Sequence, residues 1–208
     1  LREQDLRAPQ RRTVVDMVAA AVMLQGWLDR ALASIDTIAP AVENTTFHSL
    51  YFGGGTPSIL PAKHMRTLFQ AIEDNFNWHP SARREIELDP AVVDANRVQV
   101  MDEFQFESFS FGIQTLDKEI NELHNRGPQS AAVVERCLDL LPSQWWVRVT
   151  VDVLLGLKGT TPENILNDIE TLMRHPRRPN IDAFQLVPTS SYVDRHFNGS
   201  NKDFWEHI

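Results

Sequence analysis

Cysteine is almost absent from this 208-residue sequence, in which Cys137 is the only one. A single thiol cannot form an intrachain disulfide, and this shortage is typical of a reducing compartment, so we predict a cytoplasmic protein. It also excludes any site built within this chain from several thiolate ligands. Cys137 follows the apolar spacing of a predicted helix, where a lone cysteine is usually a small buried hydrophobic residue.

Long apolar runs and an excess of positive charge are missing too. No stretch approaches the roughly 20 apolar residues that span a bilayer, and the first ten residues are too polar for a signal peptide. The net charge of −8 argues against a broad nucleic-acid interface. None of the seven histidines pairs with another at a spacing typical of zinc ligands. We therefore expect neither nucleic-acid nor membrane partners, and no metal site built from histidines.

What the sequence does contain is an alternation of helix-like and strand-like segments, which is typical of an α/β fold with a parallel sheet. A further helix is predicted to open with Thr161 as its capping residue and Pro162 in its first turn. The other predicted helices cover residues 13–38, 61–77, 91–104, 116–124 and 130–141. The predicted strands cover residues 47–52, 85–89, 107–113, 147–155 and 181–187. The polar tail from residue 189 onward shows no clear pattern.

Three of the predicted strands have one hydrophilic and one apolar face. The hydrophilic faces carry Glu85, Glu87 and Asp89, then Ser108, Ser110 and Gln114, then Arg148, Thr150 and Asp152. A parallel sheet covered on both faces would be apolar on both. The pattern therefore favours a parallel sheet curled around a polar centre. An antiparallel sheet with one solvent-exposed face would show the same alternation.

The ends of these strands are the positions where function is expected, because active sites of parallel barrels lie at the C-terminal ends of the strands. Those ends carry the glycine-rich residues 53–57, Asp89, Gln114 and Asp152.

Five segments also carry a family resemblance. They are Tyr-Phe-Gly-Gly-Gly-Thr-Pro-Ser from Tyr51, Glu-Ile-Glu-Leu-Asp-Pro from Glu85, Ser-Phe-Gly-Ile-Gln from Ser110, the single Arg126, and Val-Asp-Val-Leu-Leu-Gly-Leu from Val151. In this order and spacing they resemble the coproporphyrinogen-dehydrogenase-like (HemN-like) family of radical S-adenosylmethionine (SAM) enzymes. The resemblance covers about residues 46–188, and a proline that the family usually has is replaced here by Lys158, which we interpret as a solvated loop residue.

The resemblance implies an α/β fold, namely a partial (β/α)6-type barrel of parallel strands with outer helices, open on one side and without its first strand. Residues 1–188 would form this barrel core. Residues 189–208 would begin a C-terminal region that covers the substrate, or form a tail.

The resemblance also implies which residues would hold the methionine part of SAM. Gly53, Gly54 and Gly55, followed by Thr56, would present backbone to the methionine amino group, because glycine allows close approach and unusual dihedral angles. Arg126 would pair with the methionine carboxylate through its planar guanidinium. The simpler interpretation is a tight turn and an ordinary surface arginine.

The nucleoside part of SAM would be held by residues on the strands. Glu87 and Gln114 would form hydrogen bonds with the ribose, and Asp152 would lie near it. Leu154 would help to wall the adenine, and backbone around Gln185 would border it. The simpler interpretation for Glu87 and Asp152 is that they are solvated strand carboxylates.

Radical SAM chemistry uses a 4Fe-4S cluster held by three cysteines, normally spaced Cys-x3-Cys-x2-Cys after the first barrel strand. This sequence has no such motif. Three interpretations stay open: the cluster-binding segment lies outside these residues, the protein is a cluster-less relative, or a partner chain supplies the cluster. In each case these 208 residues cannot make the radical alone.

Two classes of function follow from the resemblance. The first is a HemN-like radical SAM enzyme that uses SAM and a 4Fe-4S cluster to generate a 5′-deoxyadenosyl radical. It would methylate or oxidatively tailor an aromatic, heteroaromatic or tetrapyrrole small molecule, or act as an oxygen-independent coproporphyrinogen III dehydrogenase. An electron donor such as flavodoxin or ferredoxin would be its partner. The second class is a non-catalytic haem chaperone or a cluster-less SAM-binding relative.

Overall fold

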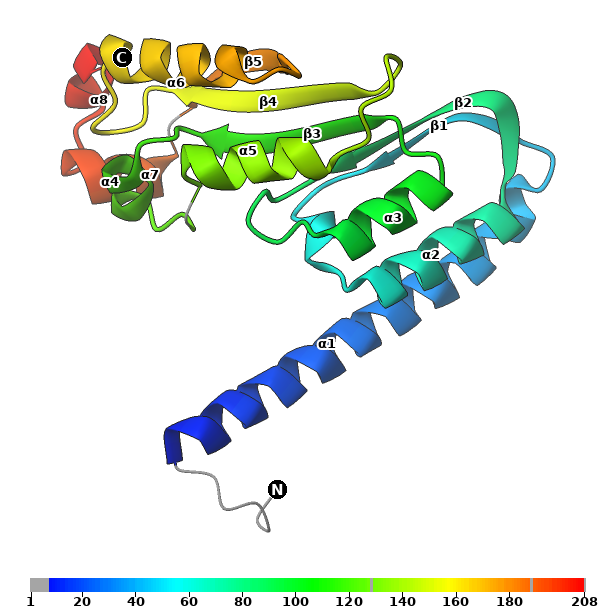
Figure 1. Ribbon diagram of the computed structural model, residues 1–208. Coiled ribbons are helices and arrows are strands. Elements are labelled where there is room, and N and C mark those ends of the chain that lie inside the picture. The colour runs from blue at the N-terminus through cyan, green and yellow to red at the C-terminus, as the bar shows by residue number, and fades with distance from the viewer. Residues whose placement is uncertain (1–7, 128, 188, 208) are drawn as a thin grey trace. The chain divides into compact units, whose positions relative to one another are not determined.

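The computed structural model describes residues 8–127, 129–187 and 189–207, and the chain divides into two compact units (Figure 1). Unit 1 contains the residues up to His48 together with Leu60–Ala82. Unit 2 contains Ser49–Ile59 and the residues from Arg83 onward. Every residue that the sequence predicts to contact SAM therefore belongs to unit 2.

Unit 1 consists of two helices and the beginnings of two strands. Figure 1 shows the second helix running alongside the C-terminal part of the first. Their buried side chains recur at helical spacing and include Leu28, Ile35, Met65, Leu68 and Phe69. The elements are α1 (Ala8–Ile38), the 3-10 helix η1 (Ala39–Val42), α2 (Ala62–Asn75), and the first parts of β1 (Thr46–Phe52) and β2 (Asn77–Glu87). Among the described residues, no helix has the length and apolar character that crossing a bilayer requires.

Unit 2 alternates strands and helices after the ends of β1 and β2. Its further elements are η2 (Pro57–Ile59), α3 (Ala95–Glu103), β3 (Ser108–Gln114), α4 (Lys118–Leu123), α5 (Ala131–Leu140), β4 (Arg148–Leu155), α6 (Pro162–Arg174), β5 (Asn180–Gln185), α7 (Ser190–Phe197) and α8 (Asn201–His207). The strands form one sheet in the order β1-β2-β3-β4-β5. Pairing of β2 with β3, β3 with β4 and β4 with β5 is parallel, which excludes the antiparallel alternative.

The predicted division between strand faces is confirmed. Along β3, Phe109, Phe111 and Ile113 are buried while the residues between them are partly exposed, and β4 buries Val149, Val151 and Val153 in the same way. The apolar strand face and the apolar stripes of α3, α5 and α6 together supply most of the buried residues of unit 2. The opposite strand face is therefore the polar one.

Helix starts follow capping side chains. The Asp94 carboxylate accepts a hydrogen bond from the Arg97 amide at 2.9 Å, so α3 begins at Ala95 rather than at the predicted residue 91. Thr161 caps α6 as predicted, and its side chain and that of Asn164 form a reciprocal capping box. These caps fix where the loops after β2 and β4 end.

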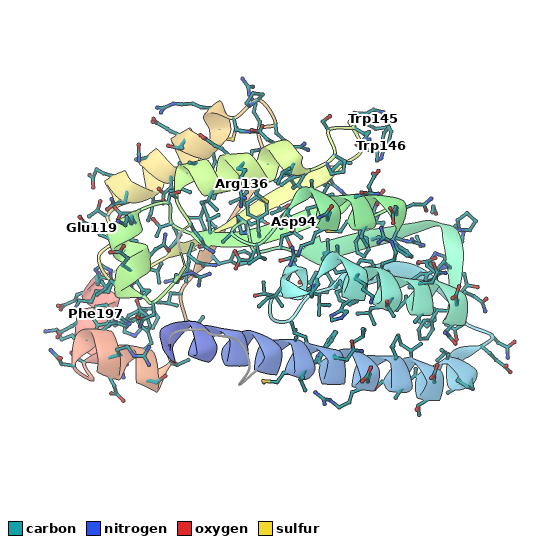
Figure 2. The ribbon with its side chains drawn as sticks, turned by 60° about the horizontal axis from the view of Figure 1, so that its bottom comes forward. Asp94, Glu119, Arg136, Trp145, Trp146 and Phe197 are labelled. Carbon is teal, nitrogen blue, oxygen red and sulfur yellow. The ribbon has the colours of Figure 1, made fainter. Side chains whose placement is uncertain are left out.

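The tail that the sequence left without a pattern forms two helices. Thr189 caps α7 by accepting a hydrogen bond from the Tyr192 amide at 3.3 Å, and Val193, Phe197 and Phe204 form a small buried cluster. Figure 2 labels Phe197 on α7, at the end of unit 2 opposite to Trp145 and Trp146. The Lys158 amide donates to the Tyr192 hydroxyl at 2.9 Å, so the turn after β4 holds α7.

Candidate functional site

A cavity of about 260 Å³ lies where the polar strand ends of unit 2 meet the glycine-rich loop. Six residues predicted from the sequence line it: Gly55, Thr56, Glu87, Gln114, Arg126 and Asp152. A larger cavity of about 500 Å³ lies near the start of β4 and is lined in part by Trp145, His175 and Arg177. We place the candidate site in the smaller cavity, because ligands of parallel α/β folds bind at the C-terminal ends of strands.

The glycine-rich loop is fastened to the end of β2 through Glu87. The Gly54 amide donates to one carboxylate oxygen of Glu87 at 3.1 Å, and the Tyr51 hydroxyl donates to the other. This hydrogen bond, burial and the negative charges nearby raise the pKa of Tyr51 to about 12. A carboxylate has about four acceptor positions, so Glu87 keeps capacity for a ligand donor.

Two glycines of the loop have backbone conformations that other residues rarely adopt. The φ angle is +84° at Gly54 and +129° at Gly55, and an added Cβ at either position would meet open space. A ligand can therefore approach this backbone closely, as the prediction required. At Gly53 a Cβ would instead collide with the Tyr51 ring, so this glycine makes room for a side chain of the protein itself.

The end of β3 is bent so that Gln114 can lie beside the cavity. Gln114 has a φ of +63°, and the register with β4 shifts between Gly112 and Gln114. Bulges of this kind re-aim side chains at strand ends. The Gln114 amide lies where a Cβ at position 112 would stand, which explains why a glycine is needed there.

The loop after β3 is anchored by the buried Asp168 of α6. Its carboxylate accepts hydrogen bonds from the Thr115 hydroxyl at 2.7 Å and the Leu116 amide at 3.1 Å. The Asn121 amide group in turn donates to the Thr115 carbonyl at 2.8 Å. This network fixes the segment that connects Gln114 with α4 and, through α4, with Arg126.

Arg126 follows α4 and reaches the cavity from that loop. Its amide donates to the Asn121 carbonyl at 2.9 Å, which holds the turn. Partial burial lowers the pKa of the Arg126 guanidinium, and the negative charge of Asp89 opposes this effect. Arginine remains cationic in proteins, so Arg126 offers the cavity a partly desolvated positive charge.

Carboxylates of neighbouring strands accumulate on the polar face. Asp152 pairs in register with Asp182 of β5, and Glu87 pairs with Ser110 of β3. Burial, followed by the charges of Asp182, Glu87 and Glu85, raises the pKa of Asp152. The cavity rim therefore favours a positively charged ligand group.

Replacing Asp152 by asparagine should raise the free energy of unfolding at neutral pH, by less than about 1 kcal/mol because the side chain is partly exposed. A raised pKa means that the charged form is disfavoured in the folded state, and this penalty disappears as the pH falls through the pKa of folded Asp152. Denaturant titrations at neutral and acidic pH measure the difference between variant and wild type. A difference that does not shrink in acid would contradict this explanation.

Four predicted residues do not line this cavity: Gly53, Gly54, Leu154 and Gln185. The Gly54 amide donates to Glu87, which does line it. Gly53 lies under Tyr51, while Leu154 pairs in register with Phe184 and Gln185 with Leu155. Gln185 is exposed at the end of β5, beyond the cavity lining. The roles of Leu154 and Gln185 at the adenine stay predictions.

Sequence reasoning gave no site role to Tyr51, Asp182 or Gln129, and it named Asp89 only as a strand-end position without a specific contact. The Tyr51 hydroxyl donates to Glu87, and the charge of Asp182 adds to the effect of burial on the pKa of Asp152. Asp89 and Gln129 line the cavity itself. Tyr51 and Asp89 stood inside the matching segments, so their positions could have been inferred. Gln129 lies in a polar loop without any distinguishing pattern.

The described residues do not fit an iron–sulfur cluster. Cys137 is buried on α5, where burial raises the pKa of its thiol to about 12. Within the described ranges, no group of three or more histidine, cysteine, aspartate or glutamate residues could hold a metal ion. We therefore derive no chemical step through a cluster held by this chain.

Comparison with known families agrees with the fold and the strand-end cavity. The model of the radical SAM superfamily matches residues 26–172, so the chain belongs to the radical SAM superfamily. Within it, the chain falls with the HemN/HemW-like proteins. The partial α/β barrel predicted from the sequence is thereby confirmed, and members of this superfamily generally use SAM and a 4Fe-4S cluster.

Three relatives illustrate the similarity. The oxygen-independent coproporphyrinogen III oxidase of Paracoccus denitrificans is 30% identical over 159 residues, which are 76% of this chain and 35% of the relative. The heme chaperone HemW of Lactococcus lactis is 22% identical over 200 residues, which are 91% of this chain and 52% of the relative. The structure of coproporphyrinogen III oxidase (HemN) from Escherichia coli superposes with a TM-score of 0.76 at 22% identity, covering 87% of this chain and 41% of that one. The chain thus spans about a third to a half of these relatives.

Proposed function

We propose that this chain forms the SAM-binding part of a HemN-like radical SAM protein. The observation that carries the proposal is the single cavity wall that brings together Gly55, Glu87, Gln114, Arg126 and Asp152 from separate segments of unit 2. Arg126 supplies positive charge for the methionine carboxylate. Glu87 and Gln114 supply hydrogen-bonding groups for the ribose, and Asp152 lies near it with a negative charge that favours the sulfonium group.

The residues of this chain would bind and orient SAM. Once bound, SAM supplies a carbon–sulfur bond whose cleavage gives the family its reactivity. The strand-end carboxylates hold the cationic end, while the positive-φ glycines allow the backbone of the loop to approach the ligand closely. Because the chain has one cysteine, the electron for that cleavage requires a cluster held by other residues.

For the reaction that follows SAM cleavage, we propose a class of substrate and a class of electron donor. We propose a small-molecule substrate, aromatic, heteroaromatic or tetrapyrrole, and an electron donor of the flavodoxin or ferredoxin kind. Similarity to the coproporphyrinogen oxidases supports a tetrapyrrole, and a methylation or tailoring reaction is the other enzymatic candidate. A haem chaperone is a second candidate, supported by the HemW relative that matches 91% of this chain.

Calorimetric titration of the 208-residue chain with SAM and with S-adenosylhomocysteine tests the proposal. We expect SAM to bind more tightly, because only SAM carries the sulfonium charge that the carboxylates around Asp152 favour. Equal affinity for the two ligands would contradict the electrostatic argument, and absence of SAM binding would contradict the proposed function. A Soret band after addition of haem would instead support the chaperone.

A further inference from the structure

The C-terminal helices α7 and α8 contact the rest of unit 2 through a group of histidine and tyrosine side chains. Figure 1 shows α4, α7 and α8 gathered at the same end of unit 2. The His196 ring of α7 lies 4.6 Å, between ring centroids, from His124 at the end of α4 and 4.6 Å from Tyr192. The rings of His124 and Tyr192 also stack, at 5.8 Å. Two imidazoles from different helices are thus in direct contact.

The turn after β4 joins the same group of side chains. His124 Nε2 lies 3.0 Å from the Lys158 carbonyl, and His207 Nε2 of α8 lies 2.8 Å from the Leu157 carbonyl. Because a carbonyl oxygen only accepts, each of these nitrogens carries a proton, and a neutral ring meets this requirement. The Lys158 ammonium group donates to the His196 carbonyl. The turn after β4 is therefore an anchor that α4, α7 and α8 share.

The charges that act on His196 are all positive. Burial lowers the pKa of His196, and the charges of protonated His124, Arg195 and Lys158 lower it further. His207 adds another imidazole at the same turn. The carboxylates of α4, α7 and α8 are all exposed and are not among the charges that shift this pKa: Glu119, Glu122, Asp194, Asp203 and Glu206. A proton on His196 would therefore add a positive charge to a cluster that is already cationic.

We propose that the contact between His124 and His196 is a pH-sensitive latch, which holds α7 and α8 in place at neutral pH and releases them in mild acid. A released His196 has the ordinary histidine pKa of about 6.5, whereas the docked residue has a lower one, so release takes up a proton. Docking is therefore strongest above the ordinary pKa and weakens as the pH falls towards the pKa of docked His196.

The latch lies beside the candidate site but does not depend on the identity of its ligand. His124 stands two residues before Arg126, which lines the strand-end cavity. Release of α7 would remove a contact from the loop that carries Arg126. The inference thus goes beyond the proposed function, and it can be tested without SAM.

Hydrogen exchange of the 208-residue chain, followed by mass spectrometry, tests the latch. Rates are compared between about pH 7.5 and about pH 5.5 after correction for the intrinsic pH dependence of amide exchange. We expect the protection of the amides of α7 and α8 to fall by about fivefold in acid, because the helices separate more often from the turn after β4. The amides of α5 serve as an internal reference and should keep their protection.

Three variants assign the effect. His196→Gln removes the titrating ring, so the protection of α7 and α8 should no longer change with pH. His124→Gln removes the contact from the α4 side, should show a smaller pH effect, and serves if the first variant does not fold. His79→Gln replaces an exposed histidine of β2 and should behave as wild type.

Four results would overturn the proposal. They are protection of α7 and α8 that does not change with pH in wild type, an equal fall in the protection of α5, a full pH effect in whichever of the His196 and His124 variants folds, and loss of the pH effect in His79→Gln. The second of these would show that all of unit 2 opens in acid rather than its C-terminal helices alone.

Discussion

Replacing Arg126 by alanine should weaken SAM binding by about thirtyfold, which corresponds to about 2 kcal/mol for a charge-assisted pair that loses one partner. The guanidinium lies in the cavity wall, and partial burial lowers its pKa, so its attraction for a carboxylate is less screened than at an open surface. Calorimetric titration with SAM measures the loss.

Two further variants test whether the loss of SAM affinity comes from the guanidinium of Arg126. Arg126→Lys keeps the charge but loses the planar fork, so we expect an intermediate affinity. Arg174→Ala removes an exposed arginine of α6 that pairs with Glu170 outside the cavity, and it should bind SAM as wild type does. If Arg126→Ala binds SAM with undiminished affinity, the methionine carboxylate lies elsewhere.

Replacing Asp168 by alanine should lower the free energy of unfolding by about 2–4 kcal/mol, because the Thr115 hydroxyl and the Leu116 amide would lose a buried acceptor. Both donors bind the same carboxylate oxygen. Asp168→Asn can therefore retain both hydrogen bonds through its single carbonyl oxygen. Urea denaturation of the two variants measures the contrast, and equal destabilisation by both would show that the charge rather than the acceptor matters.

The difference in stability between wild type and Asp168→Asn should change with pH in one direction. Burial raises the pKa of Asp168 despite its hydrogen bonds, so the folded state disfavours the charged form. Wild type should gain stability relative to Asp168→Asn as the pH falls through the pKa of folded Asp168 towards that of an ordinary aspartate. The same substitutions should affect SAM binding in the same order, because this loop leads from Gln114 to Arg126.

Regular alternation made the strands predictable. Phe109, Phe111 and Ile113 occupy one face of β3, and Asp152 occupies the polar face of β4, as the period of two required. The family resemblance then predicted Gly55, Gln114 and Arg126 at the same strand ends, and all three line one cavity in the structure.

Other features depended on contacts that no local pattern reveals. Asn77 was predicted as the last residue of a helix and the strand as starting at Glu85, but β2 begins at Asn77 and contains Pro80. α7 and α8 depend on Val193, Phe197 and Phe204 packing together, although the capping residue Thr189 was visible in the sequence. Gln129 could not be singled out at all, because lining a cavity is a property of three-dimensional surroundings rather than of residue type.

The burial of Cys137 has a practical consequence for work with this protein. A thiol whose pKa is about 12 is almost entirely protonated at neutral pH, and a protonated thiol is a poor nucleophile. The chain should thus resist alkylating reagents and air oxidation without added reductant. A protonated, buried thiol is also a poor iron ligand, so any iron that accompanies the purified chain should show no sulfur-to-iron charge transfer from Cys137.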